Sequence, residues 1–235
     1  MEIFSQHFTT KIENIRKAFP VVDDEPIALL SKLIERPNSE LDLESVEVDE
    51  IYRIINEMPS TNACGYDGIS SRIVKMIPHI TSLWLTHGIN MMIRKEVFPK
   101  VLKISRITPI MKPKKNPMMA ESYRPISNLQ TFEKVAEEVL KKRIVDYLET
   151  NNIIREEHHG GRKNHSTATA KAVLEDAAAK NLDQNKLGIL ISTNLTSAFD
   201  TVDKKILIEK MKYYGMKGKI INLMKSYLEE RHEYV

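Results

Sequence analysis

One stretch of this sequence decides the fold: Ile189-Leu190-Ile191-Ser192-Thr193-Asn194-Leu195-Thr196-Ser197-Ala198-Phe199-Asp200-Thr201-Val202-Asp203. The apolar, β-branched run from Leu187 to Ile191 predicts a buried strand, and the Ser, Thr and Asn residues that follow mark its carboxyl end. Polar side chains at such an end are placed to face a ligand. A helix is expected to start near Asp203.

The run from Asn194 to Val202 resembles the first catalytic motif of reverse transcriptases of non-LTR retrotransposons, Asp-Leu-Ser-Lys-Ala-Phe-Asp-Thr-Val. The resemblance implies that position 194 carries the Asp that binds two metal ions, helped by the backbone carbonyl of Leu195. It also implies that Phe199 packs against the nucleotide sugar and excludes ribonucleotides. Magnesium requires hard oxygen ligands, usually carboxylates, whereas Asn194 offers a neutral amide oxygen. Asp200 is predicted to cap the next helix.

Further segments resemble the same family, in its order and at roughly its spacing. They are Ala63–Ser70, Phe98–Lys114, Tyr123–Ser127, Gly160–Thr167 and Ser226–Val235. Cys64 stands where the family has Pro, and Gly161 where it has Phe. The glycines of the first segment allow the backbone to turn and to approach a partner closely.

The resemblance assigns roles to several basic residues. Arg124 would grip the triphosphate of the incoming nucleotide, because a guanidinium fork suits phosphate oxygens. Lys112 would face the triphosphate or the template. Lys114, Lys115 and Arg162 are expected on the template side. RNA template and primer DNA are the partners that this resemblance implies.

Charge is distributed unevenly behind a formal net charge of +3. Residues 21–58 hold eleven acidic and three basic residues, whereas residues 94–115 hold eight basic residues and one acidic residue. A basic block of this kind attracts phosphate backbones, although a solvated surface is the plain alternative.

Composition excludes several other classes of protein. The single cysteine, Cys64, leaves no partner for an internal disulfide and no cysteine cluster for zinc, so an intracellular location is expected. No apolar run approaches the roughly 20 residues that a membrane span requires. The single tryptophan, Trp84, lies in an apolar helical pattern and is predicted to be core. The sequence leaves the oligomeric state open.

Apolar spacing and turn residues predict a helix-rich chain with a β-hairpin at residues 98–126. Helices are expected over 4–19, 27–34, 45–58, 72–93 with a break at Pro78, 131–148, 166–179, 203–214 and 219–230. The resulting class is α+β, an incomplete right-hand polymerase fold. We divide it into a helical N-terminal extension (1–60), a fingers-like region (61–186) and a partial palm (187–235).

Polymerase chemistry by two metal ions needs a second source of carboxylates, which the family places on an Asp-Asp hairpin beyond the first motif. The Asp23-Asp24 pair is predicted to be solvated connector instead. We therefore expect a truncated, inactive reverse transcriptase fragment that takes no cofactor, whereas the intact family uses Mg²⁺. Two alternatives stay open: an RNA- or DNA-binding module without catalysis, and an incomplete domain whose Leu187 strand lacks sheet partners.

Overall fold

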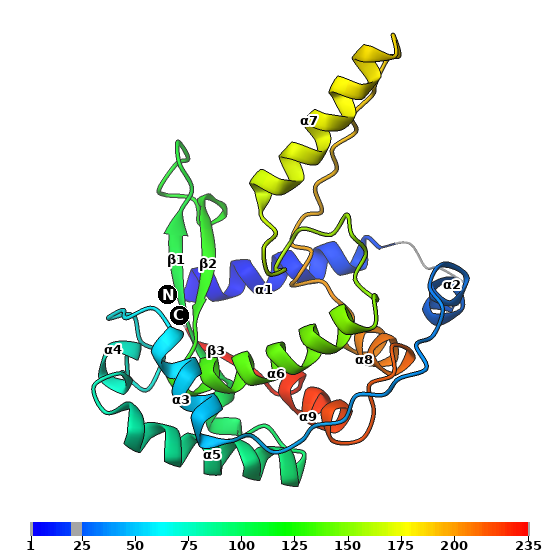
Figure 1. Cartoon of the computed structure of the whole chain (residues 1–235). Helices are drawn as coiled ribbons and strands as arrows, with labels where there is room; N and C mark the ends of the chain where they lie inside the picture. Colours follow the sequence, from blue (N-terminus) through cyan, green and yellow to red (C-terminus); the bar gives the residue numbers. More distant parts are fainter. Residues whose placement is uncertain (1, 20–24, 235) are drawn as a thin grey trace.

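The computed structural model describes residues 2–19 and 25–234, so the predicted connector at Asp23-Asp24 lies outside the described residues. A small sheet lies at one edge of a larger body of helices, which confirms the α+β class (Figure 1). The helices are α1 (Glu2–Lys17), α2 (Pro26–Leu33), α3 (Val48–Glu57), α4 (Ser71–Val74), α5 (Pro78–Lys95), α6 (Thr131–Thr150), α7 (Thr167–Asp183), α8 (Lys204–Tyr213) and α9 (Lys219–Leu228). The strands are β1 (Ile104–Met111), β2 (Tyr123–Asn128) and β3 (His232–Tyr234), with 3₁₀ turns η1 (Lys100–Lys103) and η2 (Ala120–Ser122).

The sheet has the strand order β2-β1-β3. Strands β1 and β2 pair antiparallel from Arg106–Asn128 to Met111–Tyr123, and β3 adds to the other edge of β1 in parallel. The hairpin formed by β1 and β2 extends away from the helical body, with Lys114 and Lys115 in the connection at its tip (Figure 1). This confirms the hairpin that was predicted at residues 98–126.

The hydrophobic core lies among α3, α5, α6, α8 and α9. Its fully buried members include Ile51 and Ile55 of α3, Val135 and Val139 of α6, and Ile220 of α9. These positions recur three or four residues apart within each helix, so one face of each helix packs inward. Residues from all three predicted segments thus share one core, while the segment boundaries themselves stay a prediction.

The buried strand predicted at Leu187–Ile191 is wrong. Residues 187–195 form neither strand nor helix, and Leu187 and Ile189 are 100% and 89% exposed. A strand requires a neighbour for its backbone N–H and C=O groups, and in the described residues the sheet pairs β1 with β2 and β3 instead. Apolar composition alone therefore did not bury this run.

Trp84 also departs from its predicted core position, because its side chain is 74% exposed. Helix α5 turns Ser82, Thr86 and Ile89 inward and leaves Ile80, Leu83 and Trp84 outside. None of the described helices is both long and apolar enough to cross a membrane.

Candidate functional site

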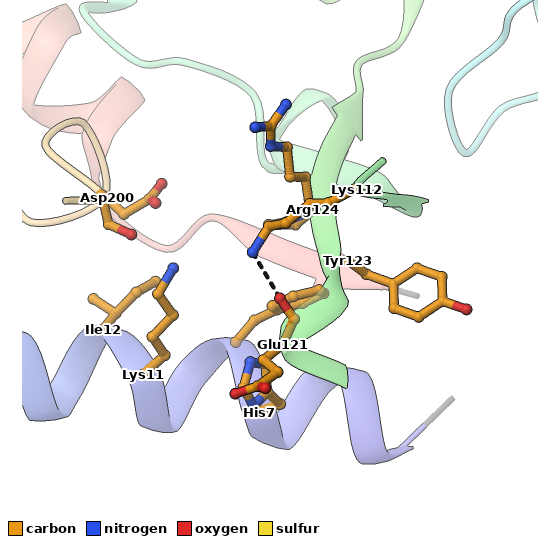
Figure 2. A pocket seen from close by; sticks show the side chains of 11 residues that line it. His7, Lys11, Ile12, Lys112, Glu121, Tyr123, Arg124 and Asp200 are labelled. Carbon is orange, nitrogen blue, oxygen red and sulfur yellow. Dashed lines mark hydrogen bonds between the residues drawn. The ribbon is translucent and has the colours of Figure 1, made fainter. Parts of the chain in front are cut away.

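A cavity of about 500 Å³ opens between α1, the end of the hairpin where β1 and β2 meet their connection, and the loop that precedes α8 (Figure 2). Helix α1 contributes His7, Phe8, Lys11 and Ile12 to its lining. The hairpin contributes Lys112, Glu121 and the start of β2 at Tyr123, Arg124 and Pro125, while the loop contributes Ser197 and Asp200. Three segments far apart in sequence therefore form one site.

The hairpin register brings its two expected nucleotide-binding residues together. Lys112 directly follows β1, and its backbone N–H donates a hydrogen bond to the Ser122 carbonyl at 2.7 Å. Arg124 is the second residue of β2 and pairs with Ile110. Lys112 is two residues beyond Ile110, so it is a diagonal neighbour of Arg124 on the same face of the hairpin, and both side chains line the same cavity.

Cations outnumber acids in the cavity lining. The basic side chains are Lys11, Lys112 and Arg124, and the acidic ones are Glu121 and Asp200. The Lys112 ammonium donates to the Glu121 carbonyl oxygen at 2.6 Å, whereas Lys11 and Arg124 have no side-chain partner within the described part of the chain (Figure 2). Such uncommitted cations suit an anionic ligand.

The other predicted site residues lie outside this cavity. Phe199 is 95% exposed, and Asn194 and Leu195 are also exposed in the unpaired stretch before it. Lys114 and Lys115 are exposed at the hairpin tip. The structure therefore brings Lys112 and Arg124 together with Ser197 and Asp200 of the first motif, but it does not bring Asn194, Leu195 or Phe199 to them.

Arg162 makes a structural contact instead. Its Nε and Nη2 donate to the two carboxylate oxygens of Glu149 at 2.8 and 2.7 Å, and its Nη1 donates to the Arg155 carbonyl at 2.8 Å. The hydrogen bond from Arg162 lowers the pKa of the Glu149 carboxyl, and the same bond raises the pKa of Arg162. The guanidinium thus ties the loop after α6 back to α6, and the template contact of Arg162 stays a prediction.

Asp200 does not cap α8, so that prediction is wrong. The cap is Asp203, whose carboxylate accepts hydrogen bonds from the backbone N–H groups of Lys205 and Ile206 at 2.7 and 3.0 Å. Asp200 is too far back along the chain to reach the first turn, and it lines the cavity instead. By contrast, the helix expected from residue 166 begins as predicted, with Ser166 as the N-cap of α7 and part of a capping box.

The residues that α1 contributes were not predicted from the sequence. The amphipathic pattern of residues 4–19 shows that this helix needs a partner, but the pattern does not name that partner. In the structure the partner is the start of β2, where Phe4 meets Tyr123 edge to face with ring centroids 5.0 Å apart. This contact places the basic residue Lys11 at the cavity.

The donor set offered by the first motif does not fit a magnesium ion. Asn194 supplies a neutral amide oxygen, and no group of at least three His, Cys, Asp or Glu side chains is suitably placed for a metal among residues 2–19 and 25–234. Magnesium sites are usually built from carboxylates together with substrate phosphates.

Comparisons with known proteins identify the chain's relatives. The family described as reverse transcriptase (RNA-dependent DNA polymerase) matches residues 112–234, which is just over half of the chain. The chain is 28% identical, over 97% of its length, to a probable RNA-directed DNA polymerase from transposon BS of Drosophila melanogaster. It is 25% identical, over 98% of its length, to the RNA-directed DNA polymerase from mobile element jockey of Drosophila funebris.

The chain belongs to the reverse transcriptase family. The relatives within that family are RNA-directed DNA polymerases of transposons and mobile elements. The chain spans about a quarter of the length of these relatives, 25% in each case.

Proposed function

We propose that this chain forms the part of a retrotransposon reverse transcriptase that holds the triphosphate of an incoming deoxynucleotide. The observation that carries the proposal is the position of Lys112 and Arg124 on one cavity. The resemblance assigns these two residues to the nucleotide from two separate motifs, and the hairpin register brings them together. A guanidinium fork and an ammonium group suit the oxygens of a polyphosphate.

The hairpin tip would hold nucleic acid beside this cavity. Lys114 and Lys115 are exposed there, and neither forms an ion pair in the described part of the chain. Lysine side chains of this kind neutralise backbone phosphates and release counterions. RNA template and primer DNA are the partners that we propose for this surface.

We further propose that the chain binds nucleotide without polymerising it. Asn194 stands where the resemblance expects a metal-binding Asp, and Phe199 is turned to solvent rather than to the cavity. Removing a negative charge from a site that holds two dications raises the reaction barrier by several kcal/mol, on the order of 3–4. The proposed role is thus recognition of substrate and template.

The experiment is a binding titration with a fluorescent deoxynucleoside triphosphate in EDTA. Arg124→Ala should weaken binding about tenfold, because a charge-assisted hydrogen bond to phosphate is lost. A matched control is Arg53→Ala, which removes an exposed arginine of α3 whose Nε donates only to the Asp49 carbonyl within its own helix. Equal affinity of the Arg124→Ala variant and the unmodified chain, or no binding by either, would overturn the proposal.

A further inference from the structure

We propose that α1 supplies a third phosphate-binding cation, Lys11, and that this helix forms one wall of the nucleotide site. The inference rests on the proposed function and adds a residue outside the motif segments that assign roles to Lys112 and Arg124. Residues 112–234 match the reverse transcriptase family, whereas α1 ends at Lys17. The assignment of Lys11 therefore comes from its position in the fold.

Two contacts hold α1 across the cavity. Near its start, Phe4 packs edge to face on Tyr123 and stacks with Phe8, with ring centroids 5.0 and 6.0 Å apart. Near its end, Arg16 Nη2 donates a hydrogen bond to the Asp200 carbonyl at 3.1 Å. The helix is thus attached to both of the other walls, the hairpin and the loop before α8.

Between these contacts, the face of α1 toward the cavity carries His7, Phe8, Lys11 and Ile12. Positions four residues apart lie above one another on a helix, so Lys11 follows His7 on this face. Figure 2 shows the Lys11 side chain rising from α1 into the space between Asp200 and Lys112. The Lys11 side chain is therefore directed toward the cavity from the solvent-exposed surface of α1.

The charge of the site supports this role. Glu121 and Asp200 would offset two cations, so Lys112 and Arg124 alone would leave the lining close to neutral. Lys11 makes the lining positive. A triphosphate carries several negative charges, and an ammonium on a flexible stem adjusts readily to a phosphate oxygen.

The test measures binding of inorganic tripolyphosphate to the full chain by titration calorimetry, in EDTA and at low salt. Lys11→Ala should weaken binding about three- to fivefold and Lys11→Glu about tenfold, as expected for an exposed charge pair. Lys11→Arg should retain most of the affinity, because the positive charge remains. The matched control is Lys17→Glu, which makes the same charge change on α1 but on a different face, outside the cavity lining.

The outcomes separate this inference from the proposed function. If Arg124→Ala loses binding while Lys11→Glu behaves like Lys17→Glu, the role of Lys11 is overturned and the proposed function stands. If the unmodified chain does not bind tripolyphosphate, both are overturned. Equal loss in Lys11→Arg and Lys11→Ala would show that packing rather than charge is responsible, which also contradicts the inference. Thermal melting of each variant checks that α1 remains folded.

Discussion

Gly65 allows a close contact between two backbone segments because it has no Cβ atom. A Cβ built at this position would lie 2.6 Å from the Gln130 nitrogen and 2.7 Å from the Gln130 Cα. Both are backbone atoms at the start of α6, so they cannot move aside without shifting the helix. The sequence suggested a close approach here, and the structure identifies the partner.

We expect Gly65→Ala to lower the free energy of unfolding by about 1–3 kcal/mol, because the added methyl group overpacks a backbone contact. Chemical denaturation gives the value. The control is Gly88→Ala in α5, where a Cβ meets nothing within 4 Å. That change should stabilise the chain by about 0.5–1 kcal/mol through higher helix propensity. A destabilising effect of the same size in both variants would refute this account.

Asn194 provides a second prediction at the residue scale. Asn194→Asp should not create polymerase activity, because position 194 is exposed in an unpaired stretch and Phe199 points to solvent. One restored carboxylate cannot by itself balance two divalent cations. Primer extension on an RNA template with Mg²⁺ is the measurement. Template-dependent product from the Asp variant, absent from the unmodified chain, would show that charge at position 194 is the decisive loss.

At the scale of elements, one end of the hairpin carries both groups of cations that we propose to bind phosphate. Lys112 and Arg124 line the cavity at the end of the β1–β2 ladder, whereas Lys114 and Lys115 in the connection beyond it are exposed to solvent. The two groups lie within a few residues of each other at the end of the β1–β2 ladder, so a ligand in the cavity and nucleic acid at the tip would contact neighbouring parts of one hairpin.

Reversal of both tip charges, Lys114→Glu with Lys115→Glu, should weaken binding of single-stranded RNA and flatten its salt dependence. Each lost phosphate contact lowers the slope of log affinity against log salt by about 0.7. The control pair Lys32→Glu with Lys205→Glu changes the same charge on α2 and α8, away from the hairpin (Figure 1). If the control pair loses as much affinity, binding depends on net charge and not on the hairpin tip.

The contact between Arg162 and Glu149 determines how the loop between α6 and α7 responds to acid. The folded-state pKa of Glu149 lies below its ordinary value of 4.5, chiefly because Arg162 donates to the carboxylate. A depressed pKa contributes stability that is present above the ordinary value and is lost as pH falls through the folded value. We therefore expect part of the acid sensitivity of the chain to come from this pair.

Glu149→Gln should lower the melting temperature at pH 7 and reduce its further decrease between pH 5 and pH 3. Thermal melting followed by circular dichroism measures both. The control is Glu138→Gln, because Glu138 pairs with Lys141 on the exposed face of α6 and such pairs contribute little. An unchanged acid profile in Glu149→Gln would contradict the assignment.

At the scale of the whole molecule, stability is concentrated away from α7. The core joins α3, α5, α6, α8 and α9, whereas α7 buries none of its residues and projects from the body (Figure 1). Elements with few buried contacts open at low free-energy cost. The described structure thus combines one cooperative core with a peripheral helix.

Hydrogen exchange should separate these parts. Amides of α7 and of residues 187–195 are expected to exchange orders of magnitude faster than those of α6, although thermal unfolding of the core remains a single transition. The comparison between α6 and α7 is internal, since both are long helices of the same chain. Equal protection of α7 and α6 would mean that α7 packs against the core in solution.

Local patterns allowed most helices to be predicted. Residues 131–148 were expected to be helical and α6 spans Thr131–Thr150, and the start of α7 agrees with its cap at Ser166. Such features depend on spacing and capping within a few residues, which the sequence contains. The same reasoning placed Asp200 instead of Asp203 at the start of α8, because local patterns locate the end of a helix only to within a few residues.

The sequence by itself determined the family, the α+β class, the hairpin and the two cations Lys112 and Arg124. Only the tertiary structure decided that Lys11 joins them, that Arg162 binds Glu149, and that Leu187–Ile191 remains exposed. The reason is physical. Helix periodicity and turn chemistry act between near neighbours, whereas burial, strand pairing and the lining of a cavity depend on which distant segment lies opposite.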